Sequence, residues 1–251
     1  MMNDVKAVLL VGGLGTRLRS VLPSTPKVLA SVGKGSFLQL LVRQLRSQGL
    51  RRLVMCTGYL ADQIENEFGN GQALDVTIEY SKEEQPLGTA GAIRLAQHHL
   101  LDVPEFLVIN GDSFLEVDFR NLMDFHRDHR AMATIAVRRV ADTRRYGTVQ
   151  VDANGRVRGF AEKTGSDAPG VVNGGVYIFN HAVLQYMPEQ SGSLERDVFP
   201  RLLDQGVYAQ EQHGMFIDIG TPEDYLRAQQ LCDSLNEAAC GGRLSGSGAE
   251  D

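Results

Sequence analysis

A short apolar segment followed by a glycine-rich loop limits the possible folds of this chain more than any other feature. Residues 8–11 form an apolar run that is typical of a strand buried on both faces of a parallel sheet. Three glycines, Gly12, Gly13 and Gly15, follow within four residues. Because glycine lacks a Cβ, backbone N–H groups in such a loop can approach a phosphate closely. Arg17 and Lys27 follow the loop, so the sequence predicts a binding site for an anionic group.

Two common phosphate-binding motifs are excluded. A dinucleotide-binding fingerprint requires a third glycine where Leu18 stands, and no Asp or Glu that could hold a ribose occurs between Val5 and Ala61. A P-loop ends in Gly-Lys-Ser/Thr, whereas Gly33-Lys34 is followed by glycine. A tight turn without a ligand would explain the glycines equally well, but it would not explain the basic residues that follow them.

The first half of the chain alternates strands with helices. Apolar segments at 8–11, 53–57, 76–80 and 106–110 predict strands, and helices are predicted at 36–49, capped by Ser36, at 62–68 and at 88–100. Strands dominate after about Ala131, at 133–137, 147–151, 156–160 and 171–179, with a hairpin turn at 152–155 and a last helix from about Thr221. This order predicts one α/β domain with a mixed, mostly parallel central sheet flanked by helices and a small β-rich part. The Gly- and Ser-rich tail 241–251 is predicted to be disordered.

Composition narrows the class of protein. With 251 residues and 43% hydrophobic content the chain can build a substantial core, and its net charge of −6 argues against binding to nucleic acid or to an anionic membrane. No apolar run approaches the ~18 residues of a membrane span, and no signal peptide is recognisable. Three widely spaced cysteines indicate neither disulfides nor zinc, so a cytoplasmic protein is expected. His126 and His129 are expected at a solvated helix end rather than in a metal site.

Three charged residues stand at informative positions. Asp112 follows the predicted strand 106–110, where ligands of open α/β sheets bind, and it either holds a divalent cation or belongs to an ordinary turn. Asp218 lies between two isoleucines, which is unusual for a surface residue, although a buried helix cap would also explain it. Lys163, beside Glu162, is either a site residue or half of a surface ion pair.

These motifs together resemble the sugar-1-phosphate nucleotidylyltransferases, from Ala7 to about Leu231. The segment GGLGTRL with Pro26-Lys27 is similar to the triphosphate-binding signature of that family, and NGD at 110–112, EK at 162–163, NGG at 173–175 and DIGT at 218–221 follow in the family's order. The segments PLGTAGAI, RYGTV, VNGGVY and FIDIGTPEDY look most like the D-glycero-α-D-manno-heptose 1-phosphate guanylyltransferases, with the mannose-1-phosphate guanylyltransferases next. Two departures stand out: residues 28–31 replace the usual Pro-Met-Ala-Pro, and Gln85 replaces the usual Glu before Pro-Leu-Gly-Thr.

The resemblance implies a fold, a reaction and a set of site residues. The fold is a Rossmann-like, GT-A-like nucleotidyltransferase domain over residues 1–240, with a nucleotide-binding half at about 1–130 and a sugar-binding half at about 131–240. The reaction transfers a nucleoside monophosphate from a triphosphate to a sugar 1-phosphate, releases pyrophosphate and uses Mg²⁺. The implied catalytic residues are Arg17, Lys27, Asp112, Lys163 and Asp218, of which Asp112 and Asp218 would be the Mg²⁺ ligands. The implied nucleotide contacts are Leu10, Gly12, Gly13, Gly15, Thr16, Gln85, Gly88 and Thr89. The implied sugar contacts are Asn110, Gly147, Glu162, Asn173 and Gly174.

The residues themselves do not decide which nucleobase the site binds. A glutamine at position 85 offers one donor and one acceptor, which suit guanine as well as uracil or thymine. GTP and a heptose or mannose 1-phosphate are therefore expected only because the chain resembles the heptose and mannose 1-phosphate guanylyltransferases. A uridylyl- or thymidylyltransferase acting on glucose or N-acetylmuramic acid 1-phosphate is an alternative, as is an inactive subunit that binds nucleotide sugars. A monomer or homodimer is expected.

Overall fold

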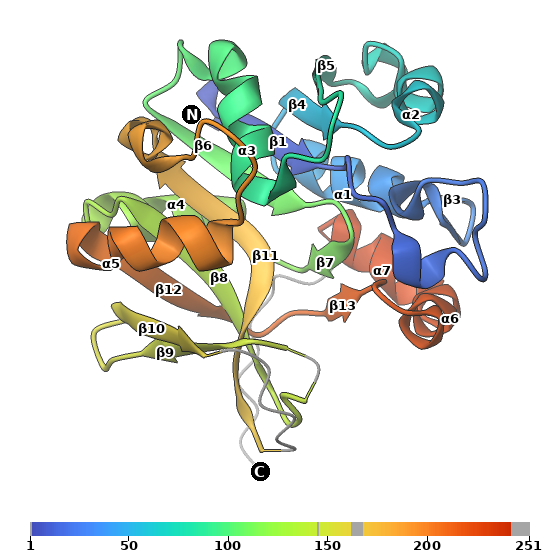
Figure 1. The fold of residues 1–251 in the computed structure, drawn as a ribbon. Coiled ribbons are helices and arrows are strands. Elements are labelled where there is room, and N and C mark those ends of the chain that lie inside the picture. Colours follow the sequence, from blue (N-terminus) through green and yellow to red (C-terminus); the bar gives the residue numbers. More distant parts are fainter. Residues whose placement is uncertain (1, 145, 162–167, 242–251) are drawn as a thin grey trace.

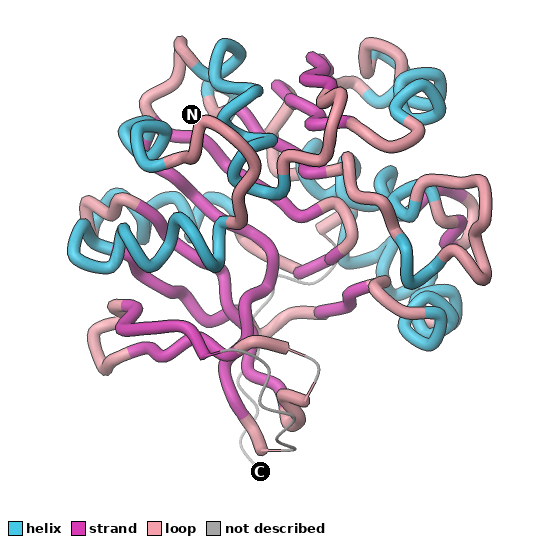
Figure 2. Tube along the Cα trace, in the orientation of Figure 1, coloured by secondary structure: helices cyan, strands magenta, loops and turns pink. Residues whose placement is uncertain are grey.

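The structure is a computed structural model, and it describes residues 2–144, 146–161 and 168–241. In this part of the chain a nine-stranded mixed sheet crosses the molecule, with helices on both faces (Figure 1, Figure 2). This arrangement confirms the predicted α/β class and its mixed central sheet flanked by helices. Glu162, Lys163 and the tail beyond Gly241 lie outside the described residues.

The parallel half of the sheet has the strand order β6-β1-β4-β5 and is built from βαβ units. Its elements are β1 (Lys6–Leu10), α1 (Phe37–Ser47), β4 (Arg52–Thr57), α2 (Ala61–Phe68), β5 (Thr77–Lys82), α3 (Gly88–Leu95) and β6 (Glu105–Asn110). Ser36 caps α1 as predicted, because its hydroxyl accepts a hydrogen bond from the Gln39 N–H at 3.4 Å. The predicted helix 88–100 is shorter in the structure, where a 3₁₀ segment (Ala96–Leu100) follows α3.

The long strand β11 (Gly170–Asn180) joins the parallel half to the rest of the sheet. It is antiparallel to β6 and to β8 (Ala133–Val140), and β12 (Val207–Gln212) pairs with β8 in parallel. β9 (Thr148–Val151) and β10 (Val157–Ala161) form the predicted hairpin, with Gly155 at a φ of +77° in the turn. This half is the β-rich part expected from the sequence.

A short ribbon beside the main sheet was not predicted. β7 (Ser113–Leu115) pairs antiparallel with β13 (Phe216–Asp218), although the two segments are far apart in the sequence. Segments of three residues are too short to show a periodic pattern, so sequence reasoning does not find them. The remaining elements are β2 (Ser31–Val32), β3 (Gly35–Ser36), α4 (Phe119–Asp128), α5 (Phe199–Gly206), α6 (Pro222–Gln230) and α7 (Cys232–Ala239).

Two hydrophobic cores fill the two faces of the sheet. On β1, Ala7 and Leu9 point into one core and Val8 into the other. The first core packs α1, α2, α4, α6 and α7 against the sheet, and the second packs α3 and α5. Because β1 is covered on both faces, its sequence is apolar without alternation.

His126 corrects one expectation. It lies near the end of α4, is 1% exposed, and has its Nδ1 2.8 Å from Thr134 Oγ1 on β8. Burial lowers the pKa of His126 to about 4. The prediction of a solvated position was wrong for this residue, because this face of α4 packs against the sheet.

The strand order reverses beside β1. The chain proceeds from β1 outward to β4 and β5, and α3 then returns it to β6 on the other side of β1. In open α/β sheets such a reversal leaves a crevice beyond the carboxyl ends of the two strands. Those ends are Leu10 and Asn110, which are register partners in the β1–β6 pair.

Candidate active site

The loop after β1 has glycine where a side chain would not fit. A Cβ on Gly12 would lie 2.9 Å from Glu83 Oε1 and 3.1 Å from the Gly58 nitrogen, and Gly15 has a φ of +57°. A Cβ on Gly13 would meet no other atom within 4 Å. The loop is therefore packed tightly on one side and accessible on the other.

A pocket of about 480 Å³ opens at this loop, between β1, β6 and the start of α3. It is lined by Leu10, Gly12, Gly13, Gly15, Thr16, Gly88 and Thr89, which are predicted nucleotide contacts, and by Arg17, Lys27, Asn110 and Asp112. Gln85 is exposed and does not line this pocket. The structure thus gathers all but one of the predicted nucleotide contacts around a single hollow.

The β7–β13 ribbon brings Asp112 and Asp218 together. Asp218 is the register partner of Ser113, and the Ile219 N–H donates to the Asp112 carbonyl oxygen at 2.9 Å. Ser113 Oγ lies 3.3 Å from Asp112 Oδ1 and 3.2 Å from Asp218 Oδ2. Two carboxylates from distant segments therefore share one hydroxyl.

Two basic side chains lie beside this acid pair. Lys27 Nζ donates to Asp112 Oδ2 at 2.6 Å, and the lysine side chain is only 10% exposed. Arg17 lies at the turn after Asp218, since a Cβ on Gly220 would be 3.2 Å from Arg17 Nη2. Burial, together with the charge of Asp112, raises the pKa of Asp218, while Lys27 and the Gly220 N–H oppose that rise. A cation placed at the two carboxylates would relieve their repulsion.

A second pocket, of about 1010 Å³, lies on the other side of Arg17 and Asp218, which both line it. Its wall also contains the predicted sugar contacts Gly147 and Asn173, and Glu195. Asn173 Nδ2 donates to the Tyr177 hydroxyl at 2.8 Å and to Glu195 Oε1 at 3.3 Å. This pocket thus carries polar groups suited to hydroxyl-rich ligands, next to the acid pair.

The walls of the two pockets are joined by hydrogen bonds. The Leu194 N–H donates to Thr89 Oγ1 at 2.8 Å, the Gly192 N–H to the Leu87 carbonyl at 2.8 Å, and the Ala90 N–H to the Gly192 carbonyl at 2.9 Å. Gly88 has a φ of +69°, and a Cβ on it would lie 2.5 Å from the Gly192 oxygen. The loop at the start of α3 and the segment before α5 therefore form one unit.

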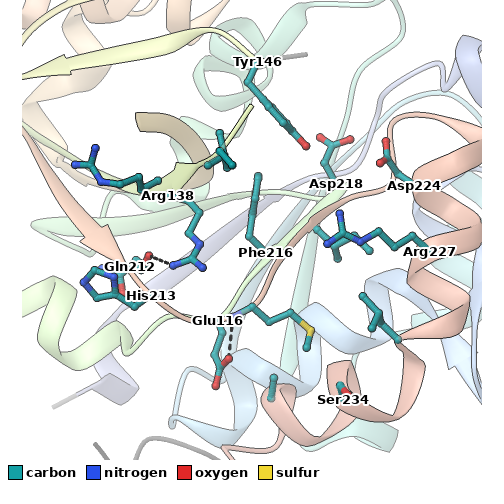
Figure 3. Close-up of a pocket in the computed structure, with 18 of the residues that line it drawn as sticks. Glu116, Arg138, Tyr146, Gln212, His213, Phe216, Asp218, Asp224, Arg227 and Ser234 are labelled. Atoms are coloured by element: carbon teal, nitrogen blue, oxygen red, sulfur yellow. Dashed lines mark hydrogen bonds between the residues drawn. The ribbon is translucent and has the colours of Figure 1, made fainter. Parts of the chain in front are cut away.

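A larger cleft, of about 1160 Å³, is lined by β13 and the loop before it, by Arg138 and by Arg227 (Figure 3). Figure 3 shows the Tyr146 side chain directed toward Asp218 at the edge of this cleft, with Arg227 reaching toward Phe216. Tyr146 and Asp218 line both this cleft and the second pocket. The ring of Tyr146 also packs against Phe216, with centroids 5.9 Å apart.

Sequence reasoning missed two carboxylates that line the pockets. Glu83, just beyond β5, lines the first pocket, where its Oε2 accepts from the Leu87 N–H at 3.1 Å and where burial raises its pKa. Glu195 lines the second. A sequence signal for Glu83 existed, because an acid at the carboxyl end of a parallel strand was the reason for selecting Asp112.

Of the other predicted sugar contacts, Asn110 lines the first pocket. Gly174 is buried, and a Cβ on it would lie 2.5 Å from Leu115 Cδ2.

A glycine loop at the switch point of an α/β sheet, next to two carboxylates and two basic side chains, defines a nucleotide-binding protein of the phosphoryl-transfer class. Comparison with known families makes this specific. The nucleotidyl transferase family matches residues 6–234, and the chain belongs to this family. This membership confirms the resemblance found in the sequence.

Two similar proteins are named as sugar-1-phosphate guanylyltransferases. The chain is 39% identical over 229 residues to the mannose-1-phosphate guanylyltransferase of Mycobacterium tuberculosis, covering 90% of this chain and 64% of that protein. It is 38% identical over 228 residues to the D-glycero-alpha-D-manno-heptose 1-phosphate guanylyltransferase of Aneurinibacillus thermoaerophilus, covering 90% of this chain and 97% of that protein. The chain thus spans slightly less than two thirds of the first relative and almost all of the second.

A solved structure is similar over almost its whole length. HddC from Yersinia pseudotuberculosis, crystallised in complex with GMP-PN, matches with a TM-score of 0.80 and 32% identity, over 90% of this chain and 98% of that one. Within the residues that the structure describes, no helix is long and apolar enough to cross a membrane.

Proposed function

We propose that this protein transfers GMP from GTP to a sugar 1-phosphate, giving a GDP-sugar and pyrophosphate. The proposed acceptor is D-glycero-α-D-manno-heptose 1-phosphate or mannose 1-phosphate, as in the names of the relatives at 38% and 39% identity. The proposed cofactor is Mg²⁺, and the proposed setting is the cytoplasm, with the protein as a monomer or homodimer.

One observation carries this proposal. The acid pair Asp112 and Asp218 lies where two pockets meet, with Arg17 lining both of them. The glycine-lined pocket suits a nucleoside triphosphate, and the second suits a sugar. A transfer between two bound substrates requires such a junction, because the reacting phosphates must approach each other there.

The chemistry requires positioning and charge neutralisation more than acid–base catalysis. A phosphate oxygen of the sugar 1-phosphate attacks the α-phosphorus of GTP, and the bond to the β-phosphate oxygen breaks. The attacking phosphate has a second pKa of ~6 and is already largely ionised near neutral pH, so no general base is needed. Lys27 is proposed to neutralise the triphosphate and the incoming phosphate, and Arg17 to stabilise the leaving pyrophosphate. By resemblance, Lys163 would hold the sugar phosphate.

The acid pair fits a magnesium ion. Mg²⁺ is usually held by one or two carboxylates, substrate phosphates and waters, and Asp112 and Asp218 supply two hard oxygen donors. Among the described residues no group of three or more His, Cys, Asp or Glu could hold a metal, so substrate phosphates would have to complete the site. When bound, the ion would neutralise charge on the reacting phosphate.

Glu83 supports guanine as the base. A carboxylate only accepts hydrogen bonds, and the Watson–Crick edge of guanine offers two adjacent donors, N1–H and the 2-amino group, whereas uracil and thymine offer one. Glu83 lines the nucleotide pocket and Gln85 does not. We therefore propose Glu83 as the residue that reads the base, with Gln85 as an outer neighbour.

The sugar side is proposed to use the second pocket. Gly147, Asn173 and Glu195 line it and would contact hydroxyl groups. Asn110, which lines the first pocket, Gly174, which is buried and lines neither pocket, and Glu162 belong to the proposed set by resemblance.

The decisive test is a substrate panel. GTP, UTP, dTTP and ATP are combined with heptose, mannose, glucose and N-acetylmuramic acid 1-phosphates, and pyrophosphate release is measured. GTP with heptose or mannose 1-phosphate is expected to give the highest kcat/KM. A preference for UTP or dTTP with glucose or N-acetylmuramic acid 1-phosphate would keep the reaction class and replace the substrates. Nucleotide binding in calorimetry without release from any pair would identify a binding subunit instead.

Two variants test the acid pair. Asp112→Asn and Asp218→Asn are each expected to remove most of the Mg²⁺-dependent turnover, at least about 100-fold, while circular dichroism remains unchanged. Asp128→Asn, at the exposed end of α4, is the matched control and should behave as wild type. Near wild-type turnover in either site variant would remove that aspartate from the metal role.

A further inference from the structure

Ser113 has an unusual position in the acid pair. It is the first residue of β7, is 6% exposed, and is the register partner of Asp218. Its Oγ lies 3.3 Å from Asp112 Oδ1 and 3.2 Å from Asp218 Oδ2. The hydroxyl thus stands between the two carboxylates rather than beside one of them.

A serine hydroxyl has a single proton to donate. Both distances exceed the 2.7–2.8 Å that is usual for a strong O–H···O bond, and they are nearly equal, so the hydroxyl is placed to donate to either carboxylate. Among the described residues, each carboxylate has one other hydrogen-bond donor: Lys27 for Asp112 at 2.6 Å, and the Gly220 N–H for Asp218 at 2.5 Å. Within the described part of the chain, Ser113 is the one side chain that hydrogen-bonds to both.

The backbone alone does not fix the spacing of the carboxylates. The ladder between Ser113 and Asp218 fixes the two main chains, but each aspartate side chain can still rotate about its own bonds. Two partly buried negative charges repel each other, which favours rotation apart when no cation is bound. A donor placed between them opposes this rotation, because it attracts both.

We infer that Ser113 is a positioning residue for the metal site: it holds Asp112 and Asp218 in the arrangement that a divalent cation requires, before that cation arrives. This inference rests on the proposed function in one respect, the binding of a divalent cation. Ser113 itself is not proposed to contact the sugar or the base. Groups that orient metal ligands without binding the metal typically contribute 10- to 100-fold to metal affinity.

The test uses three variants of the full chain. Ser113→Ala removes the hydroxyl, and Ser113→Thr retains it. Ser81→Ala is the matched control, because Ser81 is also a buried strand serine, 5% exposed, but its hydroxyl has no hydrogen-bond partner within the described structure. Because substrate phosphates would complete the metal site, Mn²⁺ is titrated into each protein in the presence of GTP and without a sugar 1-phosphate. Free Mn²⁺ is followed by electron paramagnetic resonance, with GTP in the absence of protein as the blank. In parallel, turnover is measured against Mg²⁺ concentration and against sugar 1-phosphate.

Ser113→Ala is expected to weaken Mn²⁺ binding about 10-fold or more and to raise the half-saturating Mg²⁺ concentration by a similar factor. The KM for the sugar 1-phosphate at saturating Mg²⁺ should not change. Ser113→Thr should restore both values to within a few-fold of wild type, and Ser81→Ala should match wild type.

Two results would overturn the inference. In one, Ser113→Ala binds Mn²⁺ as wild type does. In the other, it loses turnover with an unchanged Mg²⁺ dependence, which would indicate a structural role. Either result would leave the proposed function intact if the wild type is active. If the wild type neither turns over nor binds Mn²⁺, the proposed function fails as well, and the two failures are thereby distinguished.

Discussion

Replacing Gly88 by alanine tests whether the two pockets depend on each other. Gly88 lies at the start of α3 with a φ of +69°, and an added Cβ would be 2.5 Å from the Gly192 oxygen and 3.2 Å from the Gly192 carbonyl carbon. Both neighbours are backbone atoms, so the segment around Gly192 must move away. That movement would loosen the hydrogen bonds that Gly192 and Leu194 make to the loop at the start of α3.

The expected decrease in the free energy of unfolding of Gly88→Ala has two parts. A left-handed conformation costs a residue with a Cβ roughly 1–2 kcal/mol. The weakened hydrogen bonds add about 1–2 kcal/mol, which makes roughly 2–4 kcal/mol in total and a decrease in Tm of roughly 5–15 °C. Because one side of the contact lines the nucleotide pocket and the other leads to Glu195, the KM values for GTP and for the sugar 1-phosphate should both rise.

Gly206→Ala separates strain from contact. Gly206 also has a positive φ, +97°, but the nearest atom to an added Cβ is Tyr208 Cε2 at an ordinary 3.6 Å, and Gly206 lines neither pocket. This control should lose stability by roughly 1–2 kcal/mol with both KM values unchanged. Thermal unfolding and steady-state kinetics of the two variants provide the comparison. If Gly88→Ala loses no more stability than Gly206→Ala and keeps both KM values, the two loops do not act as one unit.

Three further predictions concern buried or pocket-lining groups. His126 has its pKa lowered from 6.5 to about 4 by burial, so the unfolded chain binds more protons between these values. The free energy of unfolding should therefore decrease by about 3 kcal/mol as the pH falls through this window. Urea unfolding at pH 7, 5.5 and 4 measures this decrease. In His126→Asn the free energy of unfolding should depend less on pH, and an equal pH dependence in both proteins would contradict the lowered pKa of His126. Glu83→Gln should reduce the preference for GTP over UTP, as the ratio of kcat/KM values, by about 10-fold or more, because a charged acceptor is lost while the bond from Leu87 can persist; an unchanged ratio would remove Glu83 from base recognition. Glu195→Gln should raise the KM for the sugar 1-phosphate about 10-fold with the KM for GTP unchanged, since a carboxylate binds hydroxyl donors more strongly than an amide does; an effect confined to GTP would argue against a sugar contact.

Much of the fold follows from local pattern. The alternation of apolar strands with capped helices predicts the parallel half, since a strand covered on both faces and a helix with one apolar face each have a recognisable period. The hairpin at 152–155 is equally local, because its turn requires a residue such as Gly155 at positive φ. The burial of His126 was not predictable in this way, because HRDHR is polar in sequence and only the packing of α4 against β8 removes this histidine from water.

The sequence by itself determined the glycine loop, its two basic neighbours and the class of ligand, because backbone freedom and charge are properties of neighbouring residues. Only the tertiary structure decided which carboxylates meet. Asp112 and Asp218 come together through a ribbon whose strands are too short to show a pattern, and register between distant strands is set by packing rather than by local sequence. The same holds for Glu83, the residue that we propose to read the nucleobase. β5 continues to Lys82, and the Glu83 N–H still pairs with the Thr57 carbonyl at 2.9 Å, so that Glu83 lines the pocket while Gln85 lies beyond it in solvent.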